Sequence, residues 1–172
     1  MTLWGVLALS TGEVRAEANG RVSCEITENG QSASGVVSIQ RDGKEIATGP
    51  CQGKELLLPT GDYTAALRLD GALDGPEQKQ PLHVAAGETL KLKADFATGT
   101  LEVRIASFGK RAAGMAIIKR GPQQLGTLGS GVVAHLSAGV YRVVARYRAQ
   151  EKDLGEVSMR SGQQVTLEAT FE

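Results

Sequence analysis

The sequence predicts an all-β protein made of two tandem antiparallel β-sandwich domains. Three observations lead to this prediction: apolar residues alternate with polar ones along short segments, turn residues separate these segments, and one pattern occurs twice in the 172 residues. Strict alternation buries one face of a strand and leaves the other in water, which is typical of antiparallel sheets. No segment shows a sustained helical spacing of apolar residues.

The repeated pattern divides the chain into a first domain at residues 20–98 and a second domain at residues 99–172. The segments that correspond are residues 58–68 with 136–146, and residues 86–96 with 161–171. The pattern changes little between the copies, and the exchange of Pro59 for Ser137 is a small difference. Each domain has fewer than 80 residues and is therefore expected to bury only a modest core.

In the first domain, the opening strand is expected at Val22–Ile26 and the closing strand at Leu90–Phe96, because every second residue in each is apolar. Between them, Asp42-Gly43 separates two apolar segments and predicts a two-residue hairpin turn. The turn pairs in this domain are Asn29-Gly30, Asp42-Gly43, Thr60-Gly61, Asp74-Gly75 and Ala86-Gly87. About seven short strands separated by such turns indicate a β-sandwich.

The second domain follows the same order, with an opening strand at Leu101–Ile105 and a closing strand at Val165–Phe171. Only Ala97 and Thr98 separate the two patterns. A linker this short predicts a stiff tandem rather than two independently moving domains.

Residues 1–19 lie outside the repeated pattern and are interpreted as a leader. An apolar run at residues 2–10 precedes Ala16–Ala18, which resembles the end of a secretory signal with cleavage after Ala18. Against this, no basic residue precedes the run, and Glu13 and Arg15 follow it; the alternative is an extra strand that pairs with the first domain or a partner. The run is too short to span a bilayer. Export predicts a periplasmic or extracellular location, with a cytoplasmic location as the alternative.

The sequence Leu-Pro-x-Gly-x-Tyr, the alternating strand after it, and Ala-Gly before the closing strand resemble the transthyretin-like modules. These Ig-like sandwiches include the carboxypeptidase regulatory-like and PEGA-type domains of bacterial envelope proteins. The resemblance covers residues 20–172. It implies that Gly61, Tyr63, Gly139 and Tyr141 are fold markers, which shape a turn and pack the core, and not an active site. It also implies an accessory or adhesive role and leaves the ligand open.

Cys24 and Cys51 are the only cysteines, and both lie in the first domain. An even pair in one small exported domain predicts a disulfide, which would stabilise it by roughly 3 kcal/mol. The alternative is two unpaired cysteines in a reducing cytosol, with Cys24 filling the core position of Val103 in the second domain.

The charges of the two halves differ although the formal net charge is zero. Residues 1–98 hold 9 Lys and Arg and 13 Asp and Glu, so 9 − 13 = −4, while residues 99–172 hold 10 and 6, so 10 − 6 = +4. Opposite charges would allow self-association of acidic end with basic end, or binding of an acidic polymer; the alternative is two soluble surfaces without a role in binding. The excess is too small to indicate nucleic acid.

Arg142, Arg146 and Arg148 are the candidate partner-binding residues, because alternation places them on the face opposite Tyr141. They would form a docking strip for an acidic partner, a polysaccharide or a lipid headgroup. The alternative is an ordinary solvated sheet face, which Arg68 at the equivalent place in the first domain supports.

No catalytic, metal or cofactor site is predicted. His83 and His135 have no second ligand at metal-binding spacing, and no nucleophile motif occurs. Asp70 and Asp74 lie in a glycine-rich stretch that is interpreted as a solvated turn. The sequence therefore predicts a non-enzymatic structural or protein-interaction component of a bacterial envelope or extracellular assembly. The alternative is a ligand-binding accessory module for an acidic glycan or peptide.

Overall fold

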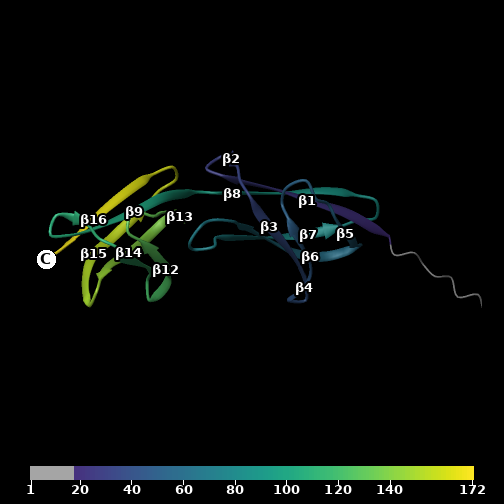
Figure 1. Ribbon diagram of the computed structural model, residues 1–172. Coiled ribbons are helices and arrows are strands. Elements are labelled where there is room, and N and C mark those ends of the chain that lie inside the picture. The colour runs from purple at the N-terminus through teal and green to yellow at the C-terminus, as the bar shows by residue number, and fades with distance from the viewer. Residues whose placement is uncertain (1–17) are drawn as a thin grey trace, which may run out of the picture.

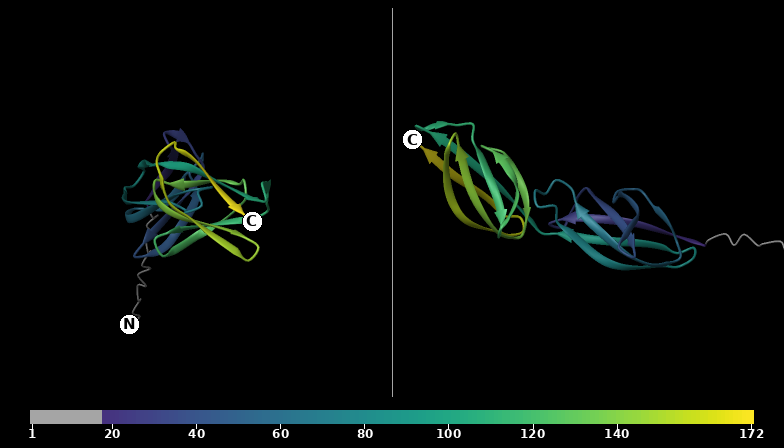
Figure 2. Two further views of the ribbon diagram at one scale, coloured as in Figure 1. Left: turned by 90° about the vertical axis from the view of Figure 1, so that its left-hand side faces the viewer. Right: turned by 90° about the horizontal axis from the view of Figure 1, so that it is seen from below.

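The computed structural model describes residues 18–172, and all of the regular structure in this range is β-strand (Figure 1). Two sandwiches lie end to end and give an elongated molecule, which Figure 2 shows along its length in the right-hand view and end-on in the left-hand view. The predicted all-β fold with two tandem sandwiches is confirmed. The expected leader lies outside the described residues except for Ala18 and Asn19, and Asn19 already begins the first strand.

The first sandwich contains eight strands in two sheets. They are β1 (Asn19–Glu28), β2 (Gln31–Ser32), β3 (Gly35–Arg41), β4 (Lys44–Pro50), β5 (Leu56–Pro59), β6 (Gly61–Leu69), β7 (Glu77–Val84) and β8 (Thr89–Phe96). In one sheet β1 lies between β8 and the short strands β2 and β5. The other sheet has the order β4-β3-β6-β7.

The second sandwich has the same arrangement. Its strands are β9 (Thr98–Ser107), β10 (Lys110–Arg111), β11 (Met115–Arg120), β12 (Gln123–Gly129), β13 (Val133–Ser137), β14 (Gly139–Tyr147), β15 (Gln150–Met159) and β16 (Gln164–Phe171). In one sheet β9 lies between β16 and the strands β10 and β13, and the other sheet has the order β12-β11-β14-β15. Only Ala97 lies between β8 and β9.

One strand pair in each sandwich is parallel, which the expectation of antiparallel sheets did not include. β8 runs parallel to β1, and β16 runs parallel to β9, whereas all other paired strands are antiparallel. The preceding strand, β7 or β15, belongs to the opposite sheet. The chain therefore crosses from one sheet to the other before the closing strand pairs with the opening strand. Because no hairpin joins these two strands, they can run parallel.

Each sandwich has its own hydrophobic core, and the alternation in the sequence identifies the side chains that form it. In β1, Val22, Cys24 and Ile26 are buried, and the neighbouring side chains are more exposed. In β9 the equivalent buried side chains are Leu101, Val103 and Ile105. The predicted hairpin is also present, because Asp42 and Gly43 both have positive φ angles and join β3 to β4.

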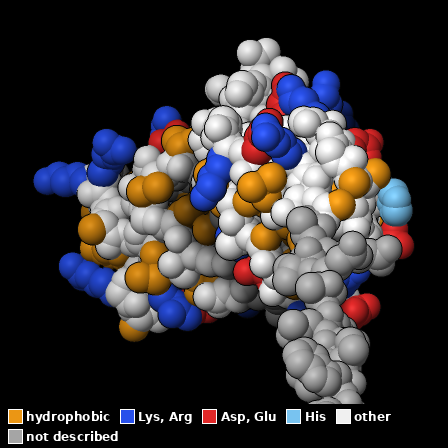
Figure 3. All heavy atoms as spheres, turned by 90° about the vertical axis from the view of Figure 1, so that its right-hand side faces the viewer, with side chains coloured by type: hydrophobic (Ala, Val, Ile, Leu, Met, Phe, Trp, Pro, Cys, Tyr) orange, Lys and Arg blue, Asp and Glu red, His pale blue; other side chains and the backbone are white. Residues whose placement is uncertain are grey.

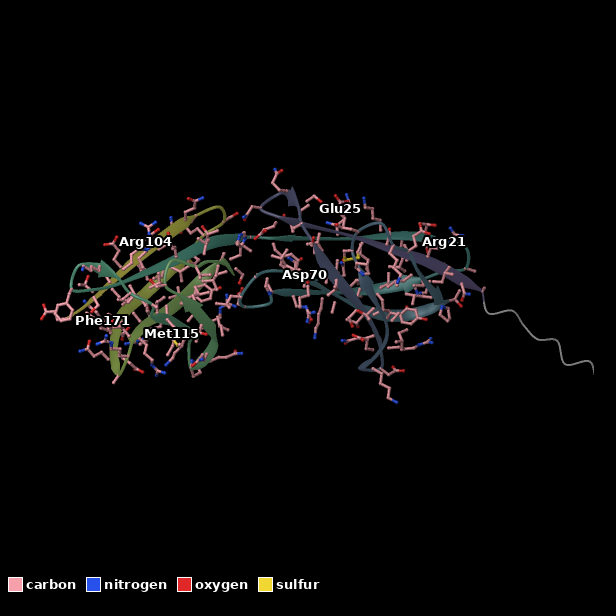
Figure 4. All side chains as sticks on the ribbon, in the orientation of Figure 1. Arg21, Glu25, Asp70, Arg104, Met115 and Phe171 are labelled. Atoms are coloured by element: carbon pink, nitrogen blue, oxygen red, sulfur yellow. A yellow bond between two sulfur atoms is a disulfide. The ribbon has the colours of Figure 1, made fainter. Side chains whose placement is uncertain are left out.

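The predicted disulfide between Cys24 and Cys51 is confirmed. It links β1 to the connection that leads from β4 in the other sheet to β5. Figure 4 shows it as a yellow bond inside this sandwich. Both cysteines are buried, and the core position of Cys24 corresponds to that of Val103 in the second sandwich.

Candidate functional site

The candidate site is the junction between the sandwiches, where the loop at residues 70–76 between β6 and β7 reaches the second sandwich. In Figure 4, Asp70 marks this loop at the inner end of the first sandwich. Ala72 forms a bridge with His135 of β13, and the Leu73 amide donates a 2.9 Å hydrogen bond to the His135 carbonyl. Leu73 packs against the second core beside Gly126, where an added Cβ would come within 2.7 Å of the leucine side chain. The loop thus docks by both backbone and side-chain contacts.

Asp74 anchors this loop through hydrogen bonds to three residues of the second sandwich. Its Oδ1 accepts from the Ser137 amide at 3.1 Å, and its Oδ2 accepts from the Ser137 hydroxyl. Oδ2 also lies 3.0 Å from the Tyr141 hydroxyl and 3.0 Å from Nη2 of Arg120. The Asp74 side chain is only 1% exposed. A carboxylate that is removed from water in this way requires such donors, because an unpaired buried charge is strongly destabilising.

The acceptor side of this junction is built around the stacking of Arg120 on Tyr141. The guanidinium carbon lies 4.8 Å from the centre of the ring, and the Tyr141 hydroxyl is 2.7 Å from the Ser137 carbonyl. Gly139 has a φ of 157°, and an added Cβ would come within 3.2 Å of Arg120. Burial, together with the negative charge of Asp74, raises the pKa of the Tyr141 hydroxyl. Tyr141 therefore stays protonated and can donate a hydrogen bond.

The interpretation of Asp74 as part of a solvated turn is wrong. The stretch is a turn, and Asp70 is exposed, but Asp74 is buried by a partner that is distant in sequence. The exchange of Pro59 for Ser137 is also more important than its size suggests, since both the amide and the hydroxyl of Ser137 bind Asp74. Proline has neither donor.

A second polar contact surrounds Thr98 at the start of β9. The Asn29 side chain donates to the Thr98 carbonyl at 3.0 Å and accepts from the Thr98 amide at 2.9 Å. The Ser161 hydroxyl donates to the same Asn29 oxygen at 2.6 Å. Asn29 thus binds the linker and the second sandwich together. Its φ of 53° lies in the left-handed region, which asparagine tolerates better than most residues.

Glu28 completes this contact from the end of β1. Its Oε1 accepts from the Thr98 hydroxyl and lies 2.7 Å from Nδ1 of His135. Partial burial raises the pKa of Glu28, but the hydrogen bonds from Thr98 and His135 and the charge of His135 outweigh it, so the pKa is lowered overall. Charged Glu28 is therefore the form that stabilises the junction. Because the hydrogen bonds of the junction satisfy its own groups, this arrangement orients the two sandwiches and offers no free reactive group.

The predicted docking strip is only partly formed by a strand face. Arg142 and Arg146 lie on β14 and are paired with Asp153 and Glu151 of the neighbouring strand β15. Arg148 lies in the turn after β14, where its guanidinium stacks 5.1 Å from the centre of the Tyr147 ring. The strip is therefore largely neutralised within its own sheet, and a role in partner binding stays a prediction.

The two histidines lie apart and each faces one carboxylate. His83 Nδ1 is 2.6 Å from Oδ1 of Asp62, and this hydrogen bond, with the charge of Asp62, raises the pKa of His83. His135 belongs to the junction. Within residues 18–172, no three His, Cys, Asp or Glu side chains gather as a metal site would require. In the same range no helix has the length and apolar character needed to cross a membrane.

No family model matches the chain, and no curated protein matches it. The resemblance to transthyretin-like modules therefore stays a prediction.

Several solved structures are similar to the chain. One is the TIE protein of Bacillus anthracis, at 15% identity and a TM-score of 0.42, with 89% of this chain but only 34% of that protein covered. Another is the minor pilin of Streptococcus agalactiae, at 12% identity and a TM-score of 0.40, covering 88% of this chain and 94% of the pilin. A third is the pilus adhesin SpaC of Lactobacillus rhamnosus, at 13% identity and a TM-score of 0.35, covering 87% of this chain and 31% of the adhesin.

Proposed function

We propose that this protein is a non-enzymatic structural component of a bacterial envelope or extracellular assembly, in which the two sandwiches act as one stiff unit. The observation that carries the proposal is the buried contact of Asp74 with Ser137, Tyr141 and Arg120. Independent binding modules on a flexible linker have no need of a buried polar contact between them. We also infer that the sandwiches are copies of one module with boundaries at residues 20–98 and 99–172, which their common strand order supports.

Two further observations support the proposal, one on the location and one on the structural role. The Cys24–Cys51 disulfide is typical of oxidising compartments. The two polar contacts at the junction connect the sandwiches independently of the one-residue linker, so force along the long axis would load hydrogen bonds rather than a slack connection.

The location and the partner can be tested together in a bacterial host that carries the gene. Cells are fractionated, and free thiols are alkylated before denaturation. We expect the protein in the envelope or medium with Cys24 and Cys51 protected, and cross-linked to a protein partner. Cytosolic protein with both thiols alkylated, or envelope protein that cross-links to no protein, would contradict the proposal. Asp74→Ala serves as the comparison, since it is expected to release the loop at residues 70–76 from the second sandwich while both cores stay unchanged.

A ligand-binding role at Arg142, Arg146 and Arg148 remains the alternative. It predicts that replacing all three arginines with alanine abolishes binding to acidic glycans or peptides. The ion pairs of Arg142 and Arg146 within the sheet argue for the structural role instead, because a docking ligand would have to compete with Asp153 and Glu151.

A further inference from the structure

The outer ends of the two sandwiches differ from the ends that meet at the junction. The outer end of the second sandwich contains the β9–β10 turn, the β14–β15 turn and the end of β16, where Figure 4 labels Phe171. The outer end of the first sandwich contains the β3–β4 turn, the start of β6 and the β7–β8 turn. Each outer end corresponds to the end of the other sandwich that lies at the junction. Comparing the two shows which charged and aromatic residues differ.

Phe108 is the most unusual residue at the outer end of the second sandwich. It is 78% exposed, and its φ of 49° lies in the left-handed region, which a bulky aromatic residue rarely adopts. The equivalent turn position in the first sandwich is Asn29, which binds across the junction to Thr98 and Ser161. The two-residue turn Phe108-Gly109 between β9 and β10 has positive φ angles at both positions, as Asp42-Gly43 does, so the turn explains the backbone conformation but not the choice of an exposed phenylalanine there. A partner that covers the ring would explain the exposed phenylalanine.

Phe108 does not stand alone, because an aromatic cluster lies behind it. Its amide donates to the Phe171 carbonyl at 3.1 Å, and the Phe171 ring is 5.8 Å from the ring of Tyr147. Arg148 stacks on Tyr147 in the next turn. This end is therefore preorganised, with Phe108 projecting from a packed base.

The charges at this end are mainly basic. Lys110 and Arg111 form β10 and are exposed. The short β14–β15 turn, which contains Arg148, lies where the first sandwich has the acidic loop at residues 70–76. The positions equivalent to Lys110 and Arg111 in β2 are Gln31 and Ser32. Compared with the equivalent end of the first sandwich, which lies at the junction, this end carries three additional positive charges and lacks the Asp74 carboxylate.

The outer end of the first sandwich has changed in the opposite direction. Asp42, Asp62 and Glu88 occupy the positions of Gly121, Val140 and Gln163 in the second sandwich, while Lys44 occupies that of Gln123, so three added carboxylates outweigh one added lysine. Figure 3 looks onto this end and shows acidic side chains around it, one of them beside a histidine. Arg41 and Lys44 also lie here, and Arg41 stacks 5.1 Å from the centre of the Tyr63 ring, as Arg120 does on Tyr141.

This end also lacks the donors that would bind an acidic loop. The Tyr63 hydroxyl donates to the Pro59 carbonyl at 2.7 Å, which matches the contact of Tyr141 with Ser137. Pro59, however, provides neither the amide nor the hydroxyl that Ser137 gives to Asp74. The outer end of the first sandwich therefore lacks the hydrogen-bond donors that hold the Asp74 loop at the equivalent end of the second sandwich. Its added carboxylates favour a basic partner.

From these complementary changes we infer that the outer end of the second sandwich, with Phe108 at its centre, binds the outer end of the first sandwich in a second copy of this chain. The contact is head-to-tail and therefore heterologous, so it can continue from copy to copy. At the junction, the end of the first sandwich that carries the Asp74 loop is acidic and the receiving end of the second sandwich is basic. In the proposed contact the equivalent ends have the opposite charges, which keeps the outer ends from competing for the junction within the chain. The inference deepens the proposed assembly role and rests on it. If the chain proves to be a monomer, an assembly role through another protein would still stand.

Sedimentation velocity of the full chain tests this contact. We expect the weight-average mass to rise with protein concentration at low ionic strength, and to fall in about 1 M salt, where the Debye length is about 3 Å. Phe108→Ala should weaken association at least tenfold, because burial of an aromatic ring dominates such a contact. Val133→Ala is the matched control, since this exposed residue lies opposite Glu102 of β9, away from the Phe108 turn.

A charge exchange identifies the two surfaces independently of Phe108. Arg148→Glu and Asp62→Lys should each weaken self-association. A mixture of the two variants should associate again, because both the exchanged pair and the original pair, which is divided between the two variants, then face opposite charges. Unchanged circular dichroism and melting temperature exclude misfolding. A chain that is monomeric at low salt up to millimolar concentration would overturn the inference. So would a Phe108→Ala variant that associates like the parent, or a mixture that gains nothing over its components.

Discussion

Replacing Asp74 with alanine is expected to release the loop at residues 70–76 from the second sandwich. The carboxylate binds the amide and hydroxyl of Ser137, Tyr141 and Arg120, and it is only 1% exposed. Removing one partner of a buried charged network costs about 3–5 kcal/mol. The lower end applies here because Arg120 is 44% exposed and water can solvate it after the loss. A cost of about 3 kcal/mol corresponds to a shift of roughly a hundredfold toward the undocked loop.

Amide hydrogen exchange measures this shift at one position. The Leu73 amide donates to the His135 carbonyl, so it exchanges only when the loop leaves the second sandwich. We expect it to exchange roughly a hundredfold faster in Asp74→Ala, and by a smaller factor in Asp74→Asn, which keeps one acceptor oxygen. Amides of β11 should keep their rates, because the second core is unchanged.

Asp70→Ala is the matched control for the same loop. Its side chain is exposed, and the hydrogen bond from the Asp70 amide to the Ser34 carbonyl does not depend on the side chain. It should leave the exchange of Leu73 nearly unchanged. Equal acceleration by Asp70→Ala and Asp74→Ala would refute the reasoning, because it would show that loop flexibility and not the buried carboxylate limits opening. An unchanged rate in Asp74→Ala would refute it directly.

Three other predictions concern the disulfide and two titrating groups. Reducing the Cys24–Cys51 disulfide should lower the free energy of unfolding of the first sandwich by about 3–4 kcal/mol, and an unchanged denaturation midpoint would contradict this. The lowered pKa of Glu28 means that its stabilisation of the junction is present above its ordinary pKa of 4.5 and is lost as the pH falls through the lowered value; Glu28→Gln should remove this dependence from the exchange of junction amides. The raised pKa of His83 means that its small contribution is present below pH 6.5 and is lost as the pH rises through the raised value. NMR titration of Asp62→Asn should return the midpoint toward 6.5, and a midpoint that does not move would exclude the Asp62 contact.

The strands and cores could be predicted because they depend on local alternation. Val22, Cys24 and Ile26 are buried because they share one side of β1, and this is visible without knowing what covers them. The parallel pairing of β8 with β1 could not be predicted in the same way. Alternation shows which face of a strand is buried, but not which strand lies beside it.

The junction could not be predicted because its partners are distant in sequence. Asp74 and Ser137 are 63 positions apart, and nothing in either local pattern indicates that they meet. One signal was present: residues 70–76 separate β6 from β7, whereas only residues 148–149 separate β14 from β15. A longer loop in one sandwich that contains an apolar residue beside an acidic one, as Leu73 and Asp74 are, indicates a docking loop better than a solvated turn.

The polar character of the junction suits a connection within one chain. Buried ion pairs contribute little net stability, since desolvation offsets much of their attraction, but they restrict geometry. Because Ala97 alone joins β8 to β9, the loop at residues 70–76 is held close to Ser137, and the effective concentration is high before any contact forms. The contacts of Asp74 then need only to select one orientation. Docking between separate chains has no such linker and must supply binding energy itself, which is consistent with an exposed aromatic residue, Phe108, at the outer end and a buried carboxylate at the inner one.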